Sequence, residues 1–313
     1  MSQDAFETSR LLRENIERVV LGKPHVVQML AISLLAGEHV LLEDVPGVGK
    51  TLAAKALAQS IDGSFARLQF TPDLLPSDIT GSVIYRSDTR EFEFSPGPIF
   101  ANVILADEIN RAPPRTQSAL LEAMSEGQVS IDGTTHLLPK PFIVVATQNP
   151  FEFEGTYSLP ESQLDRFLLR TSIGYPDRAI EQQVMSTHRS GEPVDQLKSV
   201  IGIDAIRTAQ QAVRDVRFDD TLVDYLLDIV DATRAHDGFQ VGVSTRGALS
   251  FYRGCQARAI TESRDFVTPD DVKSLAVASL SHRVLPEGIF QGASREAVET
   301  QVSDLMQQVP VPV

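Results

Sequence analysis

Hydrophobic residues at the start of the chain recur with the spacing of amphipathic helices. Residues 4–20 carry apolar positions three or four apart, which predicts a helix ending at Gly22, and residues 24–36 predict a second helix. A short apolar run at 39–42 precedes a glycine-rich turn, and residues 51–60 are rich in Ala, Leu and Lys. The predicted order is therefore helix, helix, strand, turn and helix.

Strands and helices alternate over the next hundred residues. Apolar runs at 66–70, 103–106 and 142–147 predict buried strands, and residues 115–125 have a helical pattern between two of them. Strands that alternate with helices form a parallel sheet covered by helices on both faces. We therefore expect an α/β domain.

Two segments interrupt this alternation and predict β-hairpin inserts. Residues 80–94 alternate apolar and polar positions around a turn at 86–89, and residues 128–138 do so around Asp132-Gly133. Both hairpins are expected to be additions to the parallel sheet.

The pattern changes after Tyr175-Pro176, where strand signals stop and helical periodicity continues to about Ala278. We therefore expect two domains, an α/β domain at residues 1–176 and an all-helical domain at residues 177–313. A chain of 313 residues is long enough for two such domains to bury cores of their own.

Composition narrows the class of protein. With 42% hydrophobic and 22% charged residues, the chain resembles an ordinary soluble globular protein. The formal net charge of −14 disfavours nucleic acid as the main partner, although a local basic pore in an assembly would not appear in this total.

Three further features indicate a cytoplasmic protein. The single cysteine, Cys255, has no partner for an intramolecular disulfide and lies among small and apolar residues, which suggests a core position. No secretory signal is visible at the N-terminus, and no apolar run is long enough to predict a membrane span.

The turn after the first predicted strand has the composition of a phosphate-binding loop. Its glycines let backbone N–H groups face phosphates, Lys50 can reach the β- and γ-phosphate oxygens, and Thr51 can present a hydroxyl to Mg²⁺. The usual first glycine is replaced by Asp44, and the alternative is a strand–helix turn with an incidental lysine. The expected nucleotide contacts in this segment are Val45, Pro46, Gly47, Val48, Gly49, Lys50, Thr51 and Leu52.

Two more predicted strands end in polar residues. Asp107 is expected to bind the nucleotide through its magnesium shell, and Glu108 to act as the general base on the attacking water. Asn149, after the run at 142–147, is placed to orient that water. The alternatives are an acidic turn after a strand and an Asn-Pro turn, and the common edge of a parallel sheet favours the nucleotide site.

Together these segments resemble the AAA+ ATPases, and within them the MoxR family. The resemblance is carried by residues 43–51, by Asp107-Glu108-Ile109-Asn110-Arg111-Ala112, by residues 146–150 and by residues 159–167. It implies a P-loop NTPase core, a parallel sheet between helices with two hairpin inserts, followed by an all-α lid, with ATP and Mg²⁺ held between core and lid.

The resemblance also implies roles for residues that the patterns leave open. Arg166 resembles the arginine finger that reaches a neighbouring subunit's γ-phosphate, with Arg170, one helical turn later, as the reserve candidate. Arg246 resembles the sensor 2 arginine, and Val20 and Gly22 resemble the segment that packs on adenine. The alternative for either finger candidate is a surface ion pair.

At the level of function, the resemblance implies an ATP-hydrolysing, chaperone-like remodeller of protein complexes. The same resemblance implies a homo-oligomeric ring, a hexamer, that works beside a protein with a von Willebrand factor A domain. The hairpins resemble the helix 2 insert and the presensor 1 hairpin, which face a central pore; the alternative is that they only pack together. Other functions left open are a nucleic-acid-translocating motor, a magnesium-chelatase-like subunit and a nucleotide-gated scaffold without turnover.

Overall fold

The computed structural model describes residues 2–150, 155–187, 191–287 and 295–312. At its centre is a five-stranded sheet in the order β2-β5-β8-β1-β9, in which every neighbouring pair is parallel. The strands are β1 (His39–Glu43), β2 (Phe65–Gln69), β5 (Val103–Asp107), β8 (Ile143–Gln148) and β9 (Phe167–Thr171). The predicted α/β sheet is confirmed. Strand β9 was not predicted, because three apolar residues are too short a run to separate strand from helix.

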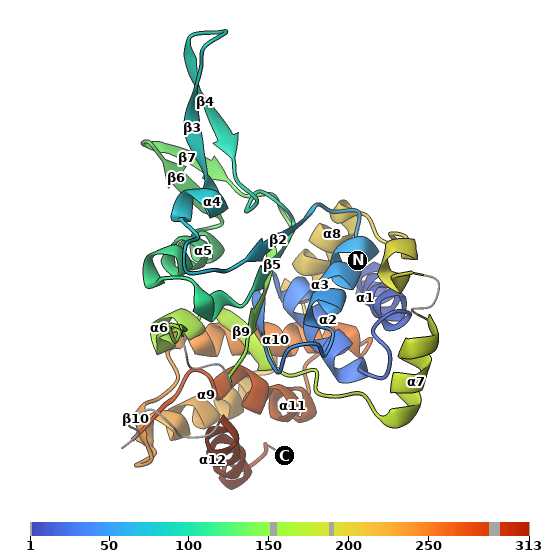
Figure 1. The fold of residues 1–313 in the computed structure, drawn as a ribbon. Helices are drawn as coiled ribbons and strands as arrows, with labels where there is room; N and C mark the ends of the chain where they lie inside the picture. Colours follow the sequence, from blue (N-terminus) through green and yellow to red (C-terminus); the bar gives the residue numbers. More distant parts are fainter. Residues whose placement is uncertain (1, 151–154, 188–190, 288–294, 313) are drawn as a thin grey trace.

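Helices cover both faces of the sheet (Figure 1). Val40 and Leu42 of β1 face a large hydrophobic cluster that includes residues of α1 (Ser2–Glu17), α2 (Pro24–Ala36) and α3 (Lys50–Ser60). Leu41 faces a second cluster with α5 (Pro114–Glu126). Alternate residues of one strand are thus buried on opposite faces, which is why the strands appear in the sequence as continuous apolar runs.

Both predicted hairpins are present. They are β3 (Gly81–Arg86) with β4 (Glu91–Pro96), preceded by α4 (Pro76–Thr80), and β6 (Gln128–Ile131) with β7 (Thr134–Leu137). They project in the same direction from the body of the molecule (Figure 1). The Phe94 ring of the first hairpin stacks on the His136 ring of the second with centroids 4.0 Å apart, so the inserts pack together.

The chain after β9 is mainly helical, as predicted. Its longer helices are α7 (Arg178–Thr187), α8 (Ile203–Arg214), α9 (Asp220–Ala235), α10 (Thr245–Thr261), α11 (Pro269–Leu280) and α12 (Arg295–Gln308). Short helical turns occur before β9 at η1 (Ile109–Arg111) and α6 (Glu161–Leu164), and after it at η3 (Pro193–Gln196). One feature absent from the prediction is a small antiparallel pairing of β10 (Phe239–Val241) with β11 (Leu285–Pro286).

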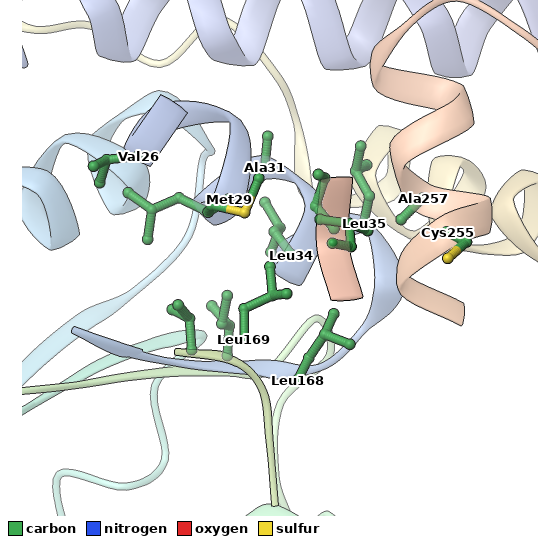
Figure 2. Close-up of a cluster of buried hydrophobic side chains, with 14 of the residues drawn as sticks. Val26, Met29, Ala31, Leu34, Leu35, Leu168, Leu169, Cys255 and Ala257 are labelled. Atoms are coloured by element: carbon green, nitrogen blue, oxygen red, sulfur yellow. The ribbon is translucent and has the colours of Figure 1, made fainter. Parts of the chain in front are cut away.

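The later helices pack directly on the first part of the chain. Figure 2 shows Leu34 and Leu35 of α2 in one hydrophobic cluster with Leu168 of β9 and Cys255 of α10. Burial raises the pKa of the Cys255 thiol, in agreement with the predicted core position. Helix α8 packs on α1 and α2. The hydrophobic core is therefore continuous across residue 176, which lies between β9 and α7.

Within the described residues, no helix combines the length and the apolar composition needed to cross a membrane.

Candidate active site

The polar residues predicted to form a site follow strands that end at one edge of the sheet. In the parallel register, Glu43 lies beside Gln148, and Gln69 lies beside Asp107. Since β8 lies between β1 and β5, the loop after β1 and the residues after β8 and β5 adjoin each other. The topology thus brings the three predicted segments together.

The loop between β1 and α3 is open and ends at a helix N-terminus. Gly47 and Gly49 have φ angles of +83° and +98°, and a Cβ added at either would meet no atom within 4 Å. Only glycine adopts such angles without strain, and the absence of side chains leaves the loop backbone accessible. The Lys50 Nζ donates to the Asp44 carbonyl oxygen at 2.6 Å, which places the ammonium against the loop. Thr51 follows in the first turn of α3.

Asp107 is held by two neighbouring strands. Its Oδ1 accepts from the Thr147 hydroxyl at 2.6 Å, and its Oδ2 accepts from the Arg67 guanidinium at 2.6 Å. The side chain is 11% exposed. The sequence analysis assigned no role to Arg67 or Thr147. A charged residue within the apolar run of β2 was the signal for Arg67, but it points to Asp107 only once β2 is known to pair with β5.

Glu108 adopts a left-handed backbone conformation with φ 57°. Its N–H donates to the Thr147 Oγ1 at 2.9 Å, and its carboxylate accepts from the Gln69 Nε2 at 2.8 Å and lies 3.3 Å from the Arg111 Nε. Left-handed conformations of residues other than glycine are unfavourable and are found at sites where surrounding contacts impose them. The bend turns Glu108 away from the strand direction.

Asn149 follows directly after β8 and is 4% exposed. This position lies at the same edge as the loop and Glu108, as predicted.

The donor set fits a phosphate with a hard cation. An ammonium, an open loop and a helix N-terminus suit phosphate oxygens, and the oxygens of Thr51 and Asp107 are of the type that Mg²⁺ prefers. Arg67 donates to one of the two Asp107 oxygens. A cation bound at Asp107 would therefore either share the carboxylate with the Arg67 guanidinium or displace that guanidinium.

Two of the predicted arginines meet at the end of α5. The Nη1 of Arg166 donates to the Leu121 carbonyl and to the Ser125 hydroxyl, and the Arg246 Nη2 donates to the same hydroxyl at 3.2 Å. Burial and the neighbouring charge of Arg246 lower the pKa of Arg166. Two guanidinium groups at one place repel each other and would be stabilised by an anion.

Asp165 connects this pair to the later helices. Its Oδ1 accepts from the Arg283 Nε and its Oδ2 from the Ser244 hydroxyl, both at 2.9 Å. Ser244 also caps α10 by accepting from the Gly247 N–H, so the helix that carries Arg246 begins at Thr245. The spacing between Arg166 and Arg246 is therefore set through Asp165.

Arg170, the reserve candidate, lies elsewhere. The expectation that it follows Arg166 by one helical turn is wrong, because it belongs to β9. Its side chain is 12% exposed and lies 3.7 Å from the carboxylates of both Glu43 and Glu299. Arg170 thus joins the end of β1 to α12.

The segment predicted to contact adenine packs against α7. Val20 is buried in the main hydrophobic cluster. Gly22 has φ +68°, and a Cβ added there would come within 2.8 Å of the Ile180 side chain, so both conformation and space require glycine.

Comparison with known proteins agrees with this architecture. The family described as "ATPase family associated with various cellular activities (AAA)" matches residues 39–169, and the AAA lid domain matches residues 231–305. The chaperone MoxR1 of Mycobacterium tuberculosis is 41% identical over 279 residues, which cover 86% of this chain and 74% of MoxR1. The chain belongs to the MoxR family of AAA+ ATPases.

Two other similarities extend over nearly the whole chain. YeaC, an uncharacterised protein of Bacillus subtilis, is 50% identical over 302 residues, which are 96% of this chain and 93% of YeaC. A solved structure from Cytophaga hutchinsonii, described as a candidate ATPase, has a TM-score of 0.89 and 37% identity, and the match covers 100% of this chain and 97% of that one. MoxR-type ATPase and lid units are therefore the parts from which this molecule is built.

Proposed function

We propose that this MoxR-family protein binds ATP with Mg²⁺ at residues 44–51 and hydrolyses it, and that a second copy completes the site with Arg166 and Arg246. The observation that carries the proposal is the separation of these groups across the sheet. Phe167 pairs with His39 at the start of β1, whereas Glu43 and the loop lie at its end. A five-residue strand is about 16 Å long, so Arg166 lies far from the loop of its own chain.

Each residue of the site has a separate task in binding or hydrolysis. The loop N–H groups and Lys50 bind the β- and γ-phosphates, Asn149 orients the attacking water, and Glu108 accepts its proton. Thr51 and Asp107 would supply oxygen ligands for Mg²⁺, which would offset the negative charge of the phosphates. The two arginines of the neighbouring copy stabilise the charge that develops on the γ-phosphate. Val20 and Gly22 line the adenine side.

At the level of biology, we propose a ring-shaped, hexameric, cytoplasmic remodeller of protein complexes that works with a von Willebrand factor A domain protein. The description of MoxR1 as a chaperone supports the remodelling role. Rotation of the lid, residues 177–313, against the core, residues 1–176, would move the two hairpins of the core along a protein client. A nucleic-acid motor has less support, because Arg86 near the tip of the first hairpin is paired with Glu93 at 2.7 Å.

The test of hydrolysis is the Glu108→Gln variant. Loss of the proton acceptor should reduce phosphate release by about a hundredfold or more, while binding of a fluorescent ATP analogue stays within a few-fold of wild type. Arg90→Gln, in the tip of the first hairpin, is the control and should turn over normally. Wild-type turnover by Glu108→Gln would remove Glu108 from this role.

A further inference from the structure

Asp44 stands where a phosphate loop usually begins with glycine, and its side chain is fully engaged. The residue is 9% exposed. Its Oδ1 accepts from the Val45 N–H at 2.8 Å, and its Oδ2 accepts from the N–H groups of Ile173 and Gly174 at 2.7 and 2.6 Å. The carboxylate therefore bridges the start of the loop and the segment that follows β9.

The backbone of Asp44 is engaged as well. Its N–H donates to the Gln148 carbonyl at 3.1 Å, and its own carbonyl accepts from Lys50. The orientation of the carbonyl that contacts Lys50 thus depends on how this one residue is held between β8 and the segment after β9.

The segment after β9 is also tied to the region proposed to pack on adenine. The Lys23 Nζ donates to the Tyr175 carbonyl at 2.8 Å, and Ile180 packs against Gly22. Asp44 is consequently the connection between the phosphate end and the adenine end of the proposed nucleotide site. Glycine at this position would provide no acceptor for these N–H groups, and buried N–H groups without an acceptor are unfavourable.

We propose that Asp44 is a positioning residue for nucleotide binding, which fixes the distance between the phosphate loop and the adenine-side segment through the N–H groups of Ile173 and Gly174. The inference rests on the proposed nucleotide site and not on hydrolysis. Asp44, in place of the usual glycine, would thus affect the affinity for nucleotide and not the chemical step.

The test compares Asp44→Asn and Asp44→Gly with wild type for binding of a fluorescent ADP analogue. The Asn side chain keeps one acceptor oxygen but turns an NH₂ group toward N–H donors, and glycine offers no acceptor at all. Both variants should therefore bind the ADP analogue at least about tenfold more weakly. In ATPase assays KM should rise while kcat at saturating ATP stays within about threefold of wild type, a split that a merely structural role would not produce. The control is Asp219→Asn, since Asp219 also accepts a backbone N–H, from Thr221 at the start of α9.

Affinity within twofold of wild type in a folded Asp44 variant would overturn the inference. If neither variant folds, hydrogen exchange of the wild-type chain is the test. The amides of Ile173 and Gly174 should exchange more slowly when ADP is added. Equal exchange rates with and without ADP would contradict the inference. Failure of the wild-type chain to bind nucleotide at all would instead contradict the proposed function.

Discussion

At the scale of single residues, His39 shows how burial affects an ionisable side chain near the paired arginines. It begins β1, its Nδ1 accepts from the Val144 N–H at 3.1 Å, and its Nε2 lies 3.1 Å from the Met124 carbonyl oxygen. This network assigns the neutral ring with its proton on Nε2. Burial lowers the pKa of His39 from 6.5 to about 4, because the charged ring is unfavourable there.

The shifted pKa predicts a pH dependence of stability. The contribution of His39 to the free energy of unfolding is complete above pH 6.5. It is lost as the pH falls toward 4, because the unfolded chain then takes up a proton that the folded chain does not. Between pH 7.5 and pH 5 this loss lowers the free energy of unfolding by about 2 kcal/mol. His39→Gln should reduce by that amount the difference between the unfolding free energies measured in urea at these two pH values.

The control for this experiment is Ser130→Ala, at an exposed position without an ionisable side chain, which should retain the wild-type pH dependence. His282 is buried with its pKa lowered in the same direction, so some dependence remains in every variant. An unchanged difference in His39→Gln would show that His39 does not carry this effect.

At the scale of elements, the start of α10 links helix stability to the paired arginines. Ser244 caps α10 and also donates to Asp165. Asp219 caps α9 by accepting from the Thr221 N–H at 3.1 Å, and the same carboxylate oxygen accepts from the Thr221 hydroxyl at 2.8 Å. The two caps are chemically alike but differ in what their helices carry.

The two caps therefore predict a separation of stability from activity. Ser244→Ala and Asp219→Ala should each lower the unfolding free energy by about 1 kcal/mol. Only Ser244→Ala should also lower the ATPase rate, by about tenfold, because it loosens both Asp165 and the helix that carries Arg246. Equal ATPase rates in the two variants, measured by phosphate release, would contradict the link.

At the scale of the whole molecule, the two halves of the proposed site face opposite edges of one sheet. The continuous core across residue 176, the contact of Arg170 with Glu299 and the contact of Arg295 with Glu43 hold the later helices against the ATPase part. Such a body has a phosphate loop at one edge and an arginine pair at the other, which suits head-to-tail contact between copies in a ring.

This arrangement predicts complementation between two inactive variants. Arg166→Ala keeps a complete loop, and Lys50→Ala keeps a complete arginine pair, so a mixture should regain part of the ATPase activity that each variant lacks alone. The activity of the wild-type chain should also fall on dilution. A mixture as inactive as its components, with mixed oligomers confirmed by sedimentation, would contradict a shared site.

Local patterns were sufficient for most of the ATPase part. The loop, Asp107, Glu108 and Asn149 follow apolar strands whose carboxyl ends must meet in a parallel sheet, so their proximity was predictable. The tip of the second hairpin was predictable from Asp132-Gly133, because few residues adopt the backbone angles of that turn. Strand β9 and the pairing of β10 with β11 were not predictable, since short segments are stabilised by their neighbours rather than by their own sequence.

The sequence by itself determined where strands and helices alternate and which loop and strand ends carry the residues proposed to contact phosphate, because loop composition and hydrophobic periodicity are local properties. Only the tertiary structure decided that Arg67 and Gln69 hold the acidic pair, that Arg166 and Arg246 meet at Ser125, and that Asp44 bridges two segments. Each of these contacts joins residues far apart in the chain. Their partners are set by the order of strands in the sheet and the docking of the later helices, which no local pattern specifies.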